Sequence, residues 1–187
     1  MQRVLITGFE KFAAAPSNPT EEMLIDFSYD DAIVKTQILP VTFASAFSEL
    51  QRVIKEFSPD YILLCGLAEN REKISIEKIG INYINSHIAD NAGEQLLDMK
   101  ISDSGEDGHF STFPTTALVS YLQQREVDIK VSLSAGSYVC NFVLYKTLEM
   151  LKGEAVKTTF IHFPKVGRGT SIKAYQQFLM HLLDYIV

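Results

Sequence analysis

The sequence predicts an α/β fold: a mainly parallel twisted sheet with helices on both faces, in a three-layer α/β/α arrangement. Two observations lead to this prediction. Short runs of β-branched and other apolar residues alternate with longer segments of helical periodicity, which is typical of parallel strands joined by helical crossovers. The chain also lacks internal repeats, low-complexity tracts and linkers, and its 187 residues suffice for one core. We therefore expect a single domain over residues 1–187.

The first part of the chain contains three expected strands and two expected helices. RVLITGF at 3–9 is typical of a strand, and NPTEEMLIDF at 18–27 of a helix capped by Asn18 or Thr20. A second strand covers AIVKTQILP, which its final proline stops. SAFSELQRVIKEF repeats apolar residues at helical spacing, whereas DYILLCG is too short for a helix and indicates a buried strand.

The second part begins with KISIEKIGINYI at 73–84, where apolar and polar residues alternate as in a half-exposed strand. Residues 85–112 are polar and rich in Gly and Asp, so we expect a long loop with one short hairpin. Loops of that length in compact domains are usually functional. The remaining chain predicts, in order, a helix, a strand, a helix, a strand and a last helix: TTALVSYLQQREV, IKVSLSAG, YVCNFVLYKTLEMLKG, KTTFIHFP and the residues from about 171 onward.

Composition excludes several classes of function. A net charge of −6 argues against a nucleic acid or an anionic membrane surface as the main partner. No apolar run approaches the roughly 18 residues that span a bilayer, and the N-terminus shows no secretory leader pattern. Two cysteines without a disulfide framework suit a reducing cytoplasm. The sequence contains no metal-ligand spacing, phosphate loop or dinucleotide fingerprint, so we expect neither metal nor cofactor.

In such sheets the functional site lies at the carboxyl ends of the strands, which here marks residues 8–12, 66–71, 135–140 and 162–164. Cys140 lies just after an expected strand end and near a helix N-terminus, where the helix dipole and free amides lower a thiol pKa and hold an oxyanion. The alternative is a small buried residue, as free cysteine usually is. Cys65, within YILLCG, has no polar neighbour and is expected in the core.

A nucleophilic cysteine needs a base, and His162 is the best placed of the four histidines. It ends an apolar strand one strand-helix unit after Cys140, and adjacent parallel strands would bring the two together. Glu77, within an otherwise apolar strand, would orient the imidazole. The alternatives are a hydrogen-bonded histidine closing a strand and a glutamate in a surface salt bridge. His87 and His109 fall in the long loop, and His181 in the last helix.

Six short segments, in this order along the chain, resemble those of a known family: LITGFEKF with the NPT that follows it, ISIEKIGIN, DNAG at 90–93, FSTFP at 110–114, AGSYVCNFVLY and FIHFP. They are similar to the pyroglutamyl peptidases (pyrrolidone-carboxylate peptidases), a family of cytoplasmic cysteine peptidases that are commonly homo-oligomers. The resemblance covers residues 2 to about 164. It implies removal of N-terminal pyroglutamyl (5-oxoprolyl) residues from peptides by a single catalytic domain.

The resemblance also implies roles for individual residues. Cys140 corresponds to the nucleophile, His162 to the catalytic histidine and Glu77 to the catalytic glutamate. The substrate pocket would comprise the aromatic side chains of Phe9 and Phe12, with Ile88, Tyr138 and Val139 lining the rest and Val41 and Thr42 nearby. For Phe9 and Phe12 the alternative is simple core packing.

Several positions depart from the family pattern. Lys11 stands where the family usually has proline, and Ala13 and Ala14 replace one glycine pair. Glu69 and Asn70 replace a glycine pair, and His87 replaces an arginine that helps the oxyanion. These departures leave open a catalytically weak or silent relative that binds a lactam or peptide terminus. Because one sheet architecture hosts many chemistries, an α/β hydrolase of another small substrate is a further alternative.

Overall fold

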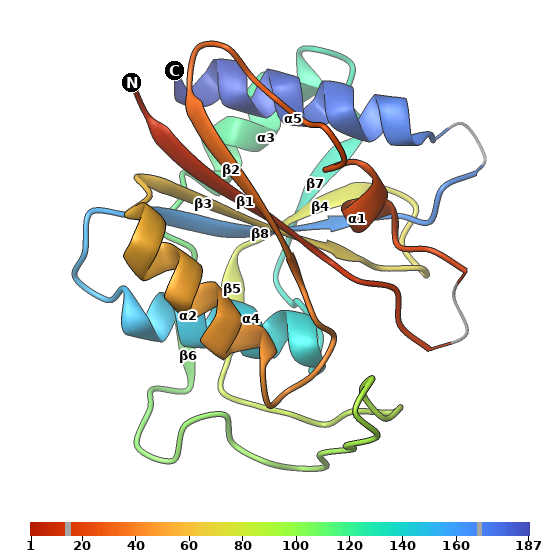
Figure 1. Cartoon of the computed structure of the whole chain (residues 1–187), viewed down its shortest axis with the longest axis vertical. Coiled ribbons are helices and arrows are strands. Elements are labelled where there is room, and N and C mark those ends of the chain that lie inside the picture. Colours follow the sequence, from red (N-terminus) through yellow and green to blue (C-terminus); the bar gives the residue numbers. More distant parts are fainter. Residues whose placement is uncertain (14–15, 168–169) are drawn as a thin grey trace.

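The computed structural model describes residues 1–13, 16–167 and 170–187 and is built around a six-stranded sheet (Figure 1). The strand order is β2-β1-β3-β8-β4-β7. The strands are β2 (Ile33–Leu39), β1 (Arg3–Phe9), β3 (Tyr61–Leu67), β8 (Lys157–Phe163), β4 (Ile74–Glu77) and β7 (Ile129–Ser132). The first four are mutually parallel, whereas β4 pairs antiparallel with β8 and parallel with β7.

Helices cover both faces of this sheet, so the predicted α/β fold is confirmed. On one face α2 (Ala46–Phe57) and α4 (Val139–Met150) pack against the sheet in one hydrophobic cluster. On the other face lie α1 (Pro19–Glu22), α3 (Thr115–Gln123) and α5 (Ile172–Ile186) (Figure 1). Because both faces are covered, the central strands β1, β3 and β8 are almost continuously buried, which explains their unbroken apolar runs.

Local sequence signals account for the ends of the helices. The Asn18 side chain accepts a hydrogen bond from the Thr20 amide and caps α1, so the N-cap is Asn18 and not Thr20. This helix ends at Glu22 and is therefore much shorter than predicted. The chain cannot continue as a helix through Asp26, whose φ of 53° is left-handed. Ser171 caps α5, because its side chain accepts a hydrogen bond from the Ala174 amide. Among the described residues, no helix is long and apolar enough to cross a membrane.

The segment 73–84 differs from the half-exposed strand that its alternation predicts. Residues 74–77 form β4 inside the main sheet, and all four are buried. Residues 79–81 form β5 (Ile79–Ile81), which pairs antiparallel with β6 (Gly108–Phe110) in a separate two-stranded sheet. The long loop is therefore present, but its last strand pairs with β5 instead of forming a hairpin within the loop. The polar residues of β4, Ser75 and Glu77, are buried instead of facing solvent. Alternation of apolar and polar residues alone does not distinguish a buried polar face from a solvent-exposed one.

The strand directions also correct one step of the sequence argument. β7, which precedes the helix bearing Cys140, is neither adjacent nor parallel to β8, since β4 lies between them and runs the other way relative to β8. Cys140 and His162 nevertheless line the same cavity, because Cys140 lies in the first turn of α4, after the segment 133–138 that follows β7.

Candidate active site

A cavity of about 350 Å³ opens where β1, β3 and β8 end and α4 begins. Cys140 and His162 both line it. The other lining residues are mostly apolar or small: Phe9, Phe12, Asn18, Val41, Leu67, Ala68, Asn70, Ala135, Gly136, Tyr138 and Val139. The sequence rule for strand ends had marked four segments, and each of them contributes to this lining.

Cys140 is the second residue of α4 and is half-buried. Tyr138 occupies the N-cap, and among the described residues no side chain caps the helix, so first-turn amides remain available to a ligand. The thiol also depends on Gly66 of β3. A Cβ atom built there would lie 3.1 Å from Cys140 Sγ and 2.7 Å from Phe160 Cζ, so only glycine leaves this wall open.

His162 and Glu77 are held together inside the sheet. His162 Nδ1 lies 2.7 Å from Glu77 Oε1, and the exposed fractions of the two residues are only 4% and 0%. The pairing of β4 with β8 sets Ser75 opposite His162, so Glu77 is the diagonal neighbour on the same face of the sheet. With Nδ1 engaged by the carboxylate, Nε2 is the ring nitrogen left for the cavity that His162 lines.

Arg71 joins this pair, although no pattern in the sequence identifies it. Its Nη1 lies 2.6 Å from Glu77 Oε1, and its Nη2 donates to the Ser134 carbonyl at 2.8 Å. The strand-end rule had marked residues 66–71, but nothing in GLAENR shows which side chain turns inward. That depends on the reversed direction of β4, which brings Glu77 beneath this loop.

The surroundings change the pKa of both reactive groups. Burial raises the pKa of the Cys140 thiol to about 12, and Glu77 adds to this rise, whereas Arg71 and the backbone amide of Cys140 lower it. Burial also lowers the pKa of the His162 imidazole, against the opposing effect of Glu77, and Arg71 lowers it further. Both shifts favour the uncharged forms, a neutral thiol and a neutral imidazole.

The residues expected to bind substrate divide into two groups. Phe9, Phe12, Tyr138 and Val139 line the cavity, and the Phe12 and Tyr138 rings lie 6.3 Å apart between centroids. Ile88 is 44% exposed and is not among the lining residues.

The structure also shows where other residues singled out in the sequence lie. His87 is exposed and outside the cavity lining, and Thr42 bonds with Ser45 instead of lining it, whereas Val41 does line it. Cys65 is fully buried with a raised pKa, which confirms its expected place in the core.

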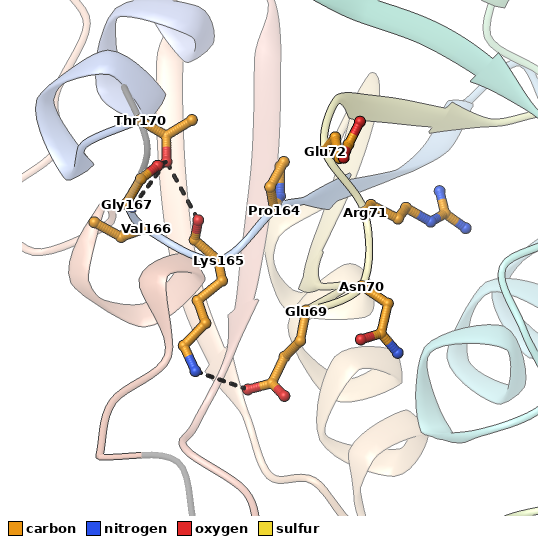
Figure 2. A pocket seen from close by; sticks show the side chains of 9 residues that line it. All are labelled: Glu69, Asn70, Arg71, Glu72, Pro164, Lys165, Val166, Gly167 and Thr170. Carbon is orange, nitrogen blue, oxygen red and sulfur yellow. Dashed lines mark hydrogen bonds and ion pairs between the residues drawn. The ribbon is translucent and has the colours of Figure 1, made fainter.

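A second, larger hollow of about 580 Å³ adjoins this cavity (Figure 2). Asn70 lines both, whereas neither Cys140 nor His162 lines the larger one. Figure 2 shows Lys165 reaching toward Glu69 across this hollow, with 4.0 Å between Nζ and Oε1, while the Arg71 side chain points away from Lys165. In the described part of the chain, no three His, Cys, Asp or Glu side chains gather as a metal site would require.

Comparison with known proteins gives a consistent result. A family model described as pyroglutamyl peptidase matches residues 2–178. The pyrrolidone-carboxylate peptidase of Thermococcus litoralis is 37% identical over 169 residues, which cover 88% of this chain and 77% of the relative. The pyrrolidone-carboxylate peptidase of Pseudomonas fluorescens strain SBW25 is 36% identical over 168 residues, covering 88% of this chain and 79% of the relative.

Solved structures agree. The pyrrolidone carboxyl peptidase from Thermococcus litoralis superposes with a TM-score of 0.91 at 32% identity, covering 100% of this chain and 95% of that one. A mutant pyrrolidone carboxyl peptidase from P. furiosus has a TM-score of 0.90 at 33% identity and covers 98% of this chain and 97% of that one. The expected class of hydrolase and cysteine peptidase is confirmed, and the chain belongs to the pyroglutamyl peptidase family.

Proposed function

We propose that this protein removes N-terminal pyroglutamyl residues from peptides, with Cys140 as nucleophile, His162 as general base and acid, and Glu77 as the group that orients His162. One observation carries the proposal. The 2.7 Å contact between His162 and Glu77 lies at the wall of a largely apolar cavity that Cys140 also lines. Residues 1–187 form the catalytic domain in this proposal.

The chemistry of the cavity suits the substrate. A pyroglutamyl residue is a lactam without a free amino group, so a carboxylate that anchors an ammonium ion would serve no purpose. Among the described residues, the cavity lining contains no Asp, Glu, Lys or Arg. Phe9, Phe12 and Tyr138 supply apolar surface for a flat five-membered ring.

The reaction begins from neutral groups. As Cys140 Sγ attacks the pyroglutamyl carbonyl carbon, His162 Nε2 takes the thiol proton, and Glu77 stabilises the imidazolium that forms. The carbonyl oxygen becomes an oxyanion at the start of α4, where the Cys140 amide and its neighbours donate to it. Removing one such donor typically costs about 3 kcal/mol of transition-state stabilisation.

The reaction is completed in two stages, formation of a thioester and its hydrolysis. The carbon–nitrogen bond breaks, and His162 returns its proton to the leaving amine, which leaves a thioester on Cys140. His162 next removes a proton from water as the water attacks the thioester. The carbon–sulfur bond then breaks, pyroglutamate is released, and His162 returns its proton to the Cys140 thiolate.

The leaving peptide passes from the smaller cavity into the larger hollow. His162 must protonate the leaving amine, and Pro164 and Lys165, the residues that follow β8, line the larger hollow. Asn70 stands at the boundary between the two.

We place the protein in the cytoplasm, because its chemistry needs a reduced thiol and both cysteines are free. The homo-oligomer that the resemblance implies stays a prediction, which analytical ultracentrifugation tests.

The direct test is hydrolysis of a chromogenic pyroglutamyl amide. We expect turnover by the native chain and none by Cys140→Ala, while Cys65→Ala retains turnover because Cys65 lies in the core, away from the cavity lining. Saturable binding of the substrate without turnover by the folded native chain would favour the silent relative. Hydrolysis of other small amides or esters, without any preference for the lactam, would favour a different hydrolase.

A further inference from the structure

Arg71 makes two contacts that lead to different parts of the candidate site. Its Nη1 donates to Oε1 of Glu77, the same oxygen that His162 Nδ1 contacts at 2.7 Å. Its Nη2 donates to the carbonyl of Ser134 at 2.8 Å. Ser134 lies in the segment 133–138 that leads from β7 to the helix bearing Cys140. One guanidinium thus links the carboxylate to the segment before the nucleophile.

The Glu77 carboxylate depends on such a partner. It is completely buried, and in the described part of the chain its Oε2 has no hydrogen-bond partner. A buried carboxylate without a cation and without donors takes up a proton, because the low-dielectric interior disfavours the charged form. Arg71 keeps its positive charge at any working pH, and its side chain is only 21% exposed, so its attraction to Glu77 is weakly screened.

The contact with Ser134 holds the start of the segment that leads to Cys140. The Ser134 carbonyl also accepts from Ser132 Oγ at 3.2 Å, and Ser134 Oγ accepts from the Gly136 amide at 3.2 Å. Gly136 has a φ of +82°, a left-handed conformation that this local network helps to hold. Arg71 supplies one of the long-range contacts of this segment and ties it to the residues after β3. Two hydrogen bonds between Ser137 and Asn85 tie the same segment to the long loop.

We propose that Arg71 is a positioning residue for the peptidase reaction: its guanidinium holds the Glu77 carboxylate aimed at His162 and helps to hold the segment that leads to Cys140. This inference rests on the proposed function. A surface ion pair would have little effect on the reaction, but this pair is buried on the Glu77 side and shares its oxygen with the imidazole.

The effect on proton binding has a definite sign. The charged side chains that act on His162 and Cys140 are Glu77 and Arg71, and Tyr138 is the neighbouring titratable group. Removing the Arg71 charge leaves the Glu77–His162 pair more negative. The coupled pair then takes up its proton at a higher pH, whichever of the two groups holds it.

The experiment compares Arg71→Met, Arg71→Lys and a matched control, Lys73→Met. Lys73 lies in the same segment, is half-exposed and pairs with Asp128, so the control removes the same charge away from Glu77. For Arg71→Met we expect kcat to fall between about 10-fold and about 10⁴-fold, the loss that follows removal of the orienting carboxylate's function in a serine triad. The acid limb of kcat/KM should move to higher pH, whereas Lys73→Met should leave it in place. Arg71→Lys keeps the positive charge, so the acid limb of kcat/KM should stay at the same pH while kcat falls only partly.

Two further measurements separate the possible failures. Guanidinium chloride at low millimolar concentration should partly restore Arg71→Ala, relative to potassium chloride, because the ion can reoccupy the vacated contacts. NMR titration of the His162 ring reports proton uptake without any turnover, so it tests the inference even if pyroglutamyl substrates are not cleaved. An unchanged titration in a folded Arg71→Met protein overturns the proposal. A native chain that titrates as expected but never cleaves the lactam overturns the proposed function alone.

Discussion

His162 Nδ1 and Glu77 Oε1 lie 2.7 Å apart although 85 residues separate them in the chain. The antiparallel pairing of β4 with β8 creates this contact, because it sets Glu77 diagonally across from His162 on one face of the sheet. The imidazole orientation is thus built into the sheet register, and a one-residue slip would turn Glu77 to the opposite face.

Glu77→Gln tests the orienting role directly. The amide keeps the size of the side chain but loses the charge that stabilises an imidazolium, so kcat should fall by roughly 10²-fold to 10⁴-fold with a smaller change in KM. Steady-state kinetics with a pyroglutamyl amide gives both values. The thermal unfolding temperature of the variant serves as the control, because losing the charged partner of Arg71 lowers stability as well. A loss of activity that only follows a loss of folded protein would contradict the role.

The pH dependence follows from the two shifted pKa values. Because burial lowers the pKa of His162, the imidazole stays neutral below its ordinary value of 6.5, and the acid limb of kcat/KM should lie below pH 6.5. Because burial raises the pKa of Cys140 to about 12, alkylation by iodoacetamide should keep accelerating through about pH 9, beyond the midpoint of an ordinary thiol. Fast, pH-independent alkylation from about pH 5 would instead indicate a thiolate–imidazolium pair at rest.

Gly66→Ala probes the wall behind the thiol. The added Cβ would lie 3.1 Å from Cys140 Sγ and 2.7 Å from the Phe160 ring, closer than ordinary contacts allow. We expect slower alkylation of Cys140 and a lower kcat, since the sulfur must move away from its position near β3. Gly153→Ala is a poor control, because its φ of +87° strains any side chain. Ala68→Gly, which removes a methyl group from the same cavity, is the better comparison and should not slow alkylation.

Phe9 and Phe12 should respond differently to substitution. Phe9 is 2% exposed and belongs to the core around α2 and α4, so Phe9→Ala should lower the free energy of unfolding by about 3–5 kcal/mol in addition to weakening binding. Phe12 is partly buried beside Tyr138, so Phe12→Ala should raise KM with a much smaller loss of stability. Chemical denaturation and kinetics measured on the same samples separate the two effects. Equal destabilisation by both substitutions would make Phe12 a core residue.

His87 should matter little to the resting site. It is exposed and does not line the cavity, so in the proposed mechanism only the amides at the start of α4 hold the oxyanion. We expect His87→Ala to change kcat by less than about twofold, well under the effect of losing an oxyanion donor. A loss of about 100-fold would show that residue 87 reaches the substrate when it binds.

Periodicity predicted most of the fold, because covered parallel strands and amphipathic helices leave distinct patterns in RVLITGF, DYILLCG and SAFSELQRVIKEF. It failed at β4, where Ile74 and Ile76 join one core cluster while Ser75 and Glu77 are also buried. A buried polar site and a solvated face leave the same alternation. Strand direction is not encoded locally either, so the reversal of β4 and β7 was not predicted, nor was Arg71, whose role depends on that reversal.

Asn70→Ala tests the path of the leaving peptide. Asn70 stands where the family pattern has glycine, and it lines both the smaller cavity that contains Cys140 and the larger hollow. Shortening it widens the passage, so kcat/KM should rise more for substrates with a bulky residue after the pyroglutamyl group than for those with alanine there. Glu69→Ala is the matched control, because Glu69 lines only the larger hollow. If the ratio of the two kcat/KM values is the same in both variants and the native chain, the leaving peptide takes another route out of the site.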